Sequence, residues 1–104
     1  MDMNKLMQQA QEMQEQLAKV QKEAANETVE ATAGGGMVTV TANGAGEIVE
    51  IKIAKEAIDP DDPEMLADLV LAAVNEALRS AQRLVESKVG PLMGGLGGLG
   101  LPGM

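Results

Sequence analysis

The N-terminal part of the chain carries apolar residues at steps that alternate between three and four positions. This spacing is a heptad repeat with its a and d positions filled, which is typical of a coiled-coil seam. Good helix formers occupy the intervening positions, and neither Gly nor Pro interrupts them. We therefore predict one helix from about Asp2 to Asn26, too long for a small domain to bury. The seam consists of Met3, Leu6, Ala10, Met13, Leu17, Val20 and Ala24.

So narrow an apolar stripe has two interpretations. The helix either lies along another helix, for which that of a second copy is the natural candidate, or it is one helix of a globular core. The stripe is rich in Met and Ala, and Met packs adaptably but specifies partners poorly. We expect the seam to pair two copies only with help from the rest of the chain. The expected interface residues are Leu6, Met13, Leu17, Val20, Leu69 and Val70.

From Thr28 the apolar period changes to two, which predicts β-strands. Three alternating runs cover residues 28–33, 37–42 and 48–53. A triple glycine separates the first two runs, and Asn43-Gly44, a strong hairpin signal, follows the second. In each run the apolar residues share one face, and mainly Thr, Glu and Lys share the other. The pattern predicts a three-stranded antiparallel meander with one buried face.

A second helix is predicted to begin at Pro63, with Asp62 as its cap and Glu64 in its first turn. Its apolar face is wide enough to cover the sheet on one side and another surface on the other. Gly90-Pro91 is expected to end the helix near Val89.

These elements predict an α+β fold with α-β-β-β-α order and one domain over residues 1–91. The first helix projects, and the meander packs on the C-terminal helix. Residues 92–104 are rich in Gly and Leu and are expected to form a disordered tail. Self-association through the leucines of this tail is the alternative.

Composition supports a shared core. The chain has 104 residues and lacks Phe, Tyr and Trp, so its core must be aliphatic and small. A second copy would enlarge that core. No apolar run approaches the roughly 20 residues of a membrane span, and the N-terminus has no signal-peptide pattern. We expect a cytoplasmic protein that does not contact membranes.

The sequence contains few residues that could act in catalysis or bind a metal. The chain has no His and no Cys, which removes the His- and Cys-based nucleophile and metal constellations. The cluster of Asp59, Asp61, Asp62 and Glu64 fails the EF-hand spacing, and helix capping explains it better. The glycine-rich segments lack the ending of a phosphate loop. We expect no enzyme activity, no metal and no cofactor.

The charge pattern points in two directions. A net charge of −8 disfavours nucleic-acid binding over the surface as a whole. The cations nevertheless gather on the two helices, although ordinary ion pairs such as Glu76–Arg79 and Arg83–Glu86 account for some of them equally well. The helical cations are Lys5, Lys19, Lys22, Arg79, Arg83 and Lys88.

The whole arrangement resembles the YbaB/EbfC family of bacterial nucleoid-associated proteins. The resemblance covers residues 1 to about 95. Its motifs are specific together, although each alone is weak. They are the opening Met3-Asn4-Lys5-Leu6-Met7 with its Gln/Met-rich continuation, the segment AGGGMVTVTANGAGEIVEIKI, the run DPDDPEMLADLVLAAVNEALRSAQ and the Gly-rich tail.

The resemblance implies a homodimer whose long helices project like the arms of tweezers and bind duplex DNA with limited sequence preference. It implies a nucleoid location, a role in nucleoid organisation, gene regulation or DNA repair, and recombination or replication proteins as further partners. Family DNA contacts are attributed to the helices. Carried over to this chain, they fall on Lys5, Gln8, Gln11, Lys19, Lys22, Arg79 and Arg83.

A protein-interaction adaptor is the competing interpretation. There the heptad seam of the first helix engages another protein, and association with DNA is indirect. The acidic net charge favours the adaptor, whereas the helical cations and the family resemblance favour direct DNA binding.

Overall fold

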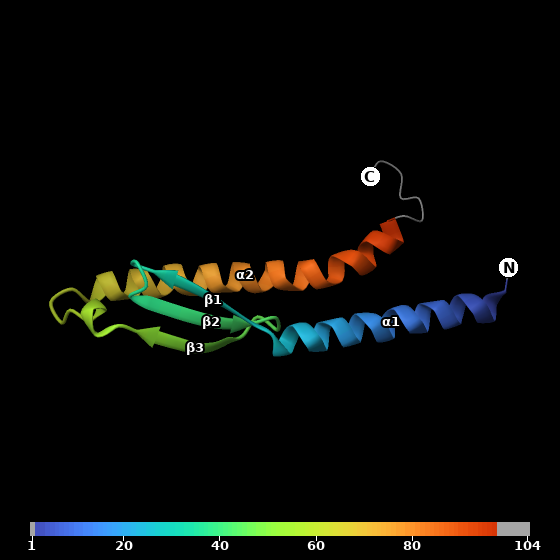
Figure 1. Ribbon diagram of the computed structural model, residues 1–104, viewed down its shortest axis with the longest axis horizontal. Coiled ribbons are helices and arrows are strands. Elements are labelled where there is room, and N and C mark those ends of the chain that lie inside the picture. The colour runs from blue at the N-terminus through green and yellow to red at the C-terminus, as the bar shows by residue number, and fades with distance from the viewer. Residues whose placement is uncertain (1, 98–104) are drawn as a thin grey trace.

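The computed structural model describes residues 2–97, with side chains through Leu92, and it is elongated, with extents of 71 × 29 × 16 Å. The α-β-β-β-α order is confirmed, and a short 3₁₀ helix precedes the last element (Figure 1). The elements are α1 (Met3–Asn26), β1 (Thr28–Ala33), β2 (Val38–Asn43), β3 (Ile48–Ile53), η1 (Lys55–Ala57) and α2 (Pro63–Gly97).

The three strands form an antiparallel sheet in the order β1-β2-β3. Ile51 lies opposite Val40 and Ile53 opposite Val38, so these four side chains share one face of the sheet. The register shifts beside Ala42, which pairs with Ile48 and leaves Val49 as the extra residue of a bulge. The predicted apolar face therefore exists, except that Ile48 replaces Val49 at its end.

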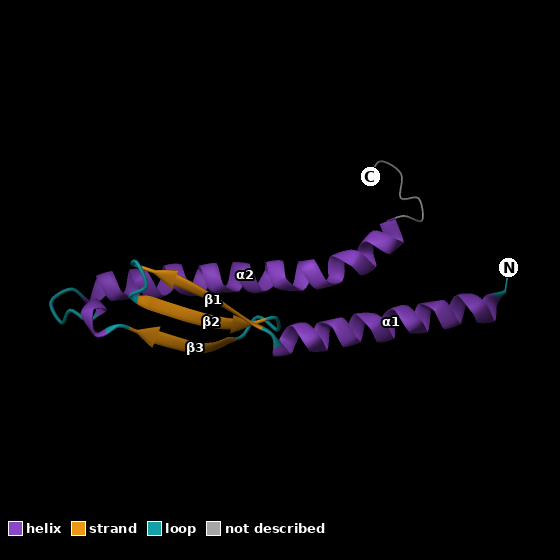
Figure 2. Ribbon diagram, viewed as in Figure 1, coloured by secondary structure: helices purple, strands orange, loops and turns teal. Residues whose placement is uncertain are grey.

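Helix α2 covers this apolar face (Figure 2). Ala73, Ala77 and Ala81 are spaced four apart and are buried against the sheet, together with Val38 and Val40. Small side chains at this spacing allow the helix backbone to approach the strands closely. The core is aliphatic as expected, and it is built from Ala and Val rather than from larger residues.

Helix α2 does not cover the sheet evenly. It makes most of its sheet contacts with β1 and β2 and few with β3. Ile51 and Ile53 therefore remain 43% and 40% exposed although they point to the same face as the buried valines. On α2 itself Leu71 is 59% exposed. One chain alone thus leaves part of its apolar surface without a partner.

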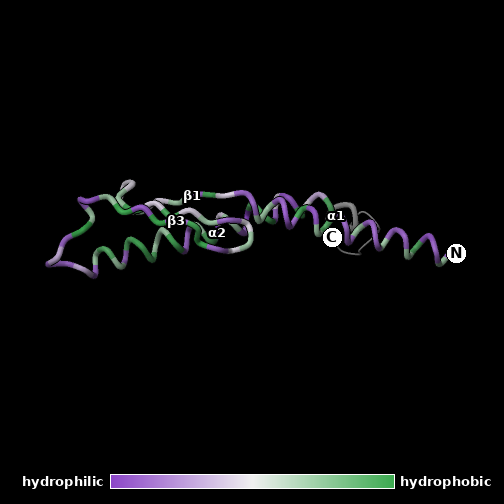
Figure 3. Tube along the Cα trace, turned by 90° about the horizontal axis from the view of Figure 1, so that it is seen from below, coloured by the Kyte–Doolittle hydropathy of each residue, from purple (hydrophilic) through white to green (hydrophobic). Residues whose placement is uncertain are grey.

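Helix α1 projects beyond the sheet (Figure 1), and its C-terminal half contacts α2. Asp2 caps the helix by accepting the Asn4 amide at 3.1 Å, as expected for its N-terminus. Figure 3 shows a mainly hydrophilic helix on which apolar positions recur. Within residues 2–97, no helix is long and apolar enough to cross a membrane.

The predicted end of the second helix is wrong. Helix α2 continues through Gly90 and Pro91 to Gly97, so the boundary expected at residue 91 falls inside it. Pro91 has no N–H to donate to the Ser87 carbonyl, and such a loss bends a helix rather than always ending it. Figure 1 shows this bend in the last turns of α2. The first residues of the expected disordered tail are therefore helical, and its residues 98–104 lie outside the described range.

Candidate nucleic-acid interface

The cations of α1 lie on the side of the helix away from its apolar seam. At 3.6 residues per turn, Lys19 and Lys22 face away from Leu17 and Val20. All three lysines and the two glutamines singled out by sequence are exposed along the arm; they are Lys5, Gln8, Gln11, Lys19 and Lys22.

These lysines are available to a ligand. Among residues 2–97, no ion pair engages Lys5, Lys19 or Lys22, although Glu15 lies one helical turn before Lys19. Each ammonium group retains its three donors for an external anion.

Charge is distributed unevenly between the arm and the body. Helix α1 carries three lysines and three glutamates and is therefore neutral, so the rest of the chain carries the whole net charge of −8. Six acidic residues gather beyond the sheet, at the end of the molecule opposite the tip of α1 (Figure 1). They are Glu56, Asp59, Asp61, Asp62, Glu64 and Asp68.

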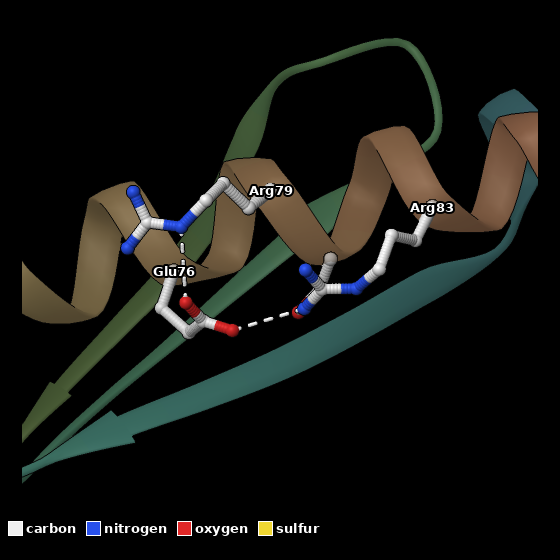
Figure 4. Close-up of polar contacts among 4 residues, drawn as sticks. Glu76, Arg79 and Arg83 are labelled. Atoms are coloured by element: carbon white, nitrogen blue, oxygen red, sulfur yellow. Dashed lines mark hydrogen bonds and ion pairs between the residues drawn. The ribbon is translucent and has the colours of Figure 1, made fainter.

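The two arginines of α2 share one carboxylate. Glu76 accepts a hydrogen bond from Arg83 at 2.9 Å and from Arg79 at 3.1 Å (Figure 4), and Arg83 also donates to the Ser80 hydroxyl at 3.0 Å. These bonds, from Arg83 and then from Arg79, lower the pKa of Glu76 below 4.5. The anion that faces both guanidinium groups thus comes from their own helix.

This arrangement confirms one predicted ion pair and corrects another. Glu76 pairs with Arg79 as expected, but Arg83 turns back to Glu76 rather than to Glu86. The two arginines carry like charges one turn apart, and a carboxylate between them relieves their repulsion. Sequence spacing alone could not distinguish the two acceptors of Arg83.

Lys88 is engaged with the arm. Its Nζ lies 2.6 Å from Glu27 Oε1, and Glu27 directly follows α1. The hydrogen bond from Glu27 raises the pKa of Lys88, against the opposing effect of desolvation. Lys88 therefore connects α2 to the base of α1.

The expected dimer residues fall into two groups. Leu69 and Val70 are half-buried and pack against the core of their own chain. On α1, Leu6 is 46% exposed, whereas Met13, Leu17 and Val20 are half-buried. Leu17 faces Val85 and Val89 of α2 across a groove of about 510 Å³.

Sequence reasoning missed the exposed apolar residues outside this set. Ile51 and Ile53 belong to the strand face predicted to be buried, and Leu71 is not among the residues singled out on the wide apolar face of the second helix. The width of that face was the available signal, because one sheet can cover only part of it.

Small-ligand features are sparse in the described chain. A second groove, of about 530 Å³, lies between the β2–β3 turn and α2 and shares Val85 and Glu86 with the first. Residues 2–97 contain no group of three or more His, Cys, Asp or Glu placed to hold a metal ion. The exposed helical surface is therefore the main candidate for recognition.

Comparison with known proteins decides the family. A model of the YbaB/EbfC DNA-binding family matches residues 1–96. The chain belongs to this family. A nucleoid-associated protein of Acetivibrio thermocellus is 53% identical over 103 residues, which cover 99% of this chain and 89% of the relative. One from Chloroflexus aurantiacus is 54% identical over 99 residues, covering 95% and 99% of the two chains.

A solved structure supports the fold of this YbaB/EbfC protein independently. The crystal structure of an uncharacterised protein from Helicobacter pylori superposes with a TM-score of 0.77, covering 89% of this chain and 98% of that one. The two sequences are 22% identical, so the likeness concerns the fold alone. The expected family membership and fold class are thus confirmed.

Proposed function

We propose that this YbaB/EbfC protein binds duplex DNA directly and without catalysis, as a homodimer that holds the phosphate backbone between its α1 arms. The observation that supports this most strongly is that the lysines of α1, a neutral helix that projects from an acidic body, form no ion pair within the described residues. The arm offers DNA cations without the repulsion that the rest of the surface would exert.

Electrostatic screening lets the arm act separately from the body. A helix of 24 residues is about 36 Å long, whereas the Debye length at physiological ionic strength is about 8 Å. Lys5, near the tip, is therefore separated by several screening lengths from the acidic cluster at the other end of the molecule. The net charge of −8 weakens long-range attraction to DNA but leaves local phosphate contacts favourable.

A second copy supplies the second arm. Ile51 and Ile53 on β3 and Leu71 on α2 leave apolar side chains exposed on each chain. The same side chains on a symmetry-related copy would cover them in an isologous contact. We expect the interface to include Ile51 and Ile53 on β3, together with the expected residues of α1 and α2. Sedimentation at micromolar concentration should give twice the mass of one chain; a monomer would contradict the dimer.

The number of phosphate contacts determines how steeply the DNA affinity falls with salt concentration. Two arms that place four to six cations on phosphates predict a slope of about −4 to −5 in log K against log salt. Lys and Gln contacts to phosphates position a protein without reading sequence, so preference among duplexes should be weak. The chain has no aromatic residue on which unpaired bases could stack, and single strands should not be preferred.

A salt titration on random-sequence duplex DNA tests the proposal. Lys19→Ala/Lys22→Ala should lower both the affinity and the salt slope. The matched control Lys52→Ala/Lys55→Ala removes the same charge from β3 and η1 and should change both much less. Equal losses in the two variants would mean that net charge, rather than the arm, governs binding.

A protein-interaction adaptor is the second candidate function, because the apolar seam of α1 is exposed near the N-terminal tip of the helix. Met3, Leu6 and Met7 are exposed there, so this part of the arm offers an apolar surface to another protein. A recombination or replication protein is the expected kind of partner, with the protein still located at the nucleoid. If the purified protein fails to bind duplex DNA even at low salt, the adaptor is the better account.

A further inference from the structure

Helix α1 contacts α2 along its C-terminal half and contacts the sheet at its C-terminal end. Ala24, at 1% exposed, is its only buried residue. The carbonyl oxygen of Ala24 accepts the backbone N–H of Glu27 at 3.1 Å and that of Gly44 at 3.0 Å. The first bond ends the helix, and the second ties it to the turn between β2 and β3.

Gly44 makes this contact possible because it has no side chain. A Cβ at this position would lie 2.2 Å from the Ala24 carbonyl oxygen and 2.9 Å from the Ala24 Cβ. The turn is held in shape by Asn43, whose Oδ1 accepts the amides of Ala45 at 2.9 Å and Glu47 at 3.1 Å. Asn43-Gly44 thus both forms the hairpin turn and contacts the C-terminal end of α1.

A third contact comes from α2. Lys88 is 25% exposed, and its Nζ lies 2.6 Å from the Glu27 carboxylate, one residue beyond the end of α1. The base of the arm is therefore held from the sheet by Gly44 and from the second helix by Lys88. Two attachments on different elements restrict rotation of the arm as well as its translation.

We infer that Ala24, Gly44 and the Glu27–Lys88 ion pair form a joint that fixes the direction of α1 and so positions the arm lysines on duplex DNA. This inference rests on the proposed function. The joint residues act through the arm and do not touch DNA themselves, so they are positioning residues.

Because α1 is long, a small rotation at the joint displaces the far end of the helix by several ångströms. Lys5 lies 19 positions from Ala24, or about 28 Å along the helix. A rotation of about 10° at the joint therefore moves Lys5 by about 5 Å, more than the roughly 3.4 Å between successive phosphates along the duplex axis. A small change at Gly44 or Lys88 thus moves Lys5 away from the phosphate that it contacts, whereas Lys19 and Lys22, within about 8 Å of Ala24 along the helix, move much less.

The direction of the arm can be measured without DNA. The chain has no Cys, so Gln14→Cys/Thr32→Cys introduces the only two labelling sites, one on α1 and one on β1. Pulsed electron spin resonance on this doubly nitroxide-labelled protein, diluted with unlabelled protein, gives the arm-to-body distance distribution. Lys88→Gln should broaden this distribution, and Lys52→Gln, which breaks the Glu50–Lys52 pair with the same charge change, should not.

DNA binding is then measured on the same variants without labels. Lys88→Gln should weaken binding about threefold, because the pair it breaks is partly exposed. Gly44→Ala should shift the distance distribution and weaken binding more than Lys88→Gln does, because its Cβ would clash with the Ala24 carbonyl. Its control, Gly90→Ala, adds a Cβ that meets no atom within 4 Å and should change neither measurement. The exchange Glu27→Lys/Lys88→Glu should restore both the distance distribution and the affinity.

Two results overturn the inference. One is an unchanged distance distribution in Lys88→Gln, and the other is a changed distribution with unchanged DNA affinity. If Gly44→Ala fails to fold, Lys88→Gln and the exchanged pair still decide the question. Failure of the proposed function would look different, because loss of Lys19 and Lys22 would then leave DNA binding intact whatever the arm distance.

Discussion

The two helices of this protein use similar apolar spacing for different purposes. Helix α2 buries an alanine stripe against the sheet, and Ala73, Ala77 and Ala81 are almost inaccessible. Helix α1 buries only Ala24 of its stripe fully, and the residues toward its N-terminus are exposed. The comparison teaches that a periodic apolar stripe predicts a helix reliably but does not say what covers it. The covering surface depends on elements elsewhere in the chain.

The helices also differ in how they hold their cations. The lysines of α1 have no ion-pair partner among the described residues, whereas both arginines of α2 share Glu76. The lysines of α1 are thus more available to an external phosphate than the arginines of α2. We therefore expect the lysines of α1 to contribute more to DNA binding than the arginines of α2.

The largest expected effect is on stability, and it distinguishes the apolar stripe of α2 from that of α1. Ala77→Leu should lower the free energy of unfolding by about 1–3 kcal/mol, because added atoms overpack the contact between α2 and the sheet. The same change in α1, Ala10→Leu, should alter it by less than about 0.5 kcal/mol because Ala10 is exposed. Urea unfolding measures both; equal effects would mean that the stripe of α1 is buried in solution.

The second prediction compares the cations of the two helices. Lys19→Ala/Lys22→Ala should reduce the magnitude of the salt slope by about 3 to 4 in a dimer, since each lost phosphate contact removes about 0.9. Arg79→Ala/Arg83→Ala should reduce it by less, because Glu76 already occupies these groups. Fluorescence anisotropy on a random duplex at several salt concentrations makes the comparison. A larger loss from the arginine variant would move the interface to α2.

A third and smaller effect concerns Glu76 itself. Glu76→Gln weakens the hold on both arginines and should raise DNA affinity about twofold to threefold, since surface ion pairs are individually weak. Glu86→Gln changes the net charge equally, but Glu86 forms no ion pair within the described residues. Its affinity gain should be smaller. Identical gains would show that only net charge matters.

The smallest effect is a pH dependence of stability. The pKa of Glu76 is lowered in the folded chain, so its ionised form contributes stability that is fully present above pH 4.5. That contribution is lost as the pH falls through the folded pKa. Melting temperatures measured from about pH 6 to pH 3 should therefore fall less steeply for Glu76→Gln than for the natural chain. Parallel curves would contradict the ion pairs in solution.

Sequence patterns predicted much of the fold because the period of apolar positions follows backbone geometry. The change from a heptad to alternation at Thr28 marks the start of β1, and Asp62 caps α2 by accepting the Met65 amide at 3.2 Å. The end of α2 was missed because Gly90 and Pro91 disfavour a helix without forbidding it.

The candidate site was less predictable. Which acid neutralises Arg83, which apolar residues β3 leaves exposed, and why Gly44 is needed all depend on contacts between side chains or distant segments. None of these contacts has a local signature in the sequence. The cations on α1 are exposed because a helix with a narrow apolar stripe presents its other residues to solvent, and their contact with DNA stays a prediction.

The most direct test of the central claim is the salt titration on random duplex DNA with the natural chain and with Lys19→Ala/Lys22→Ala. The account predicts a slope of about −4 to −5 for the natural chain, with lower affinity and a shallower slope for the variant. A flat salt dependence, or a variant that matches the natural chain in both quantities, would contradict phosphate binding by the α1 arms.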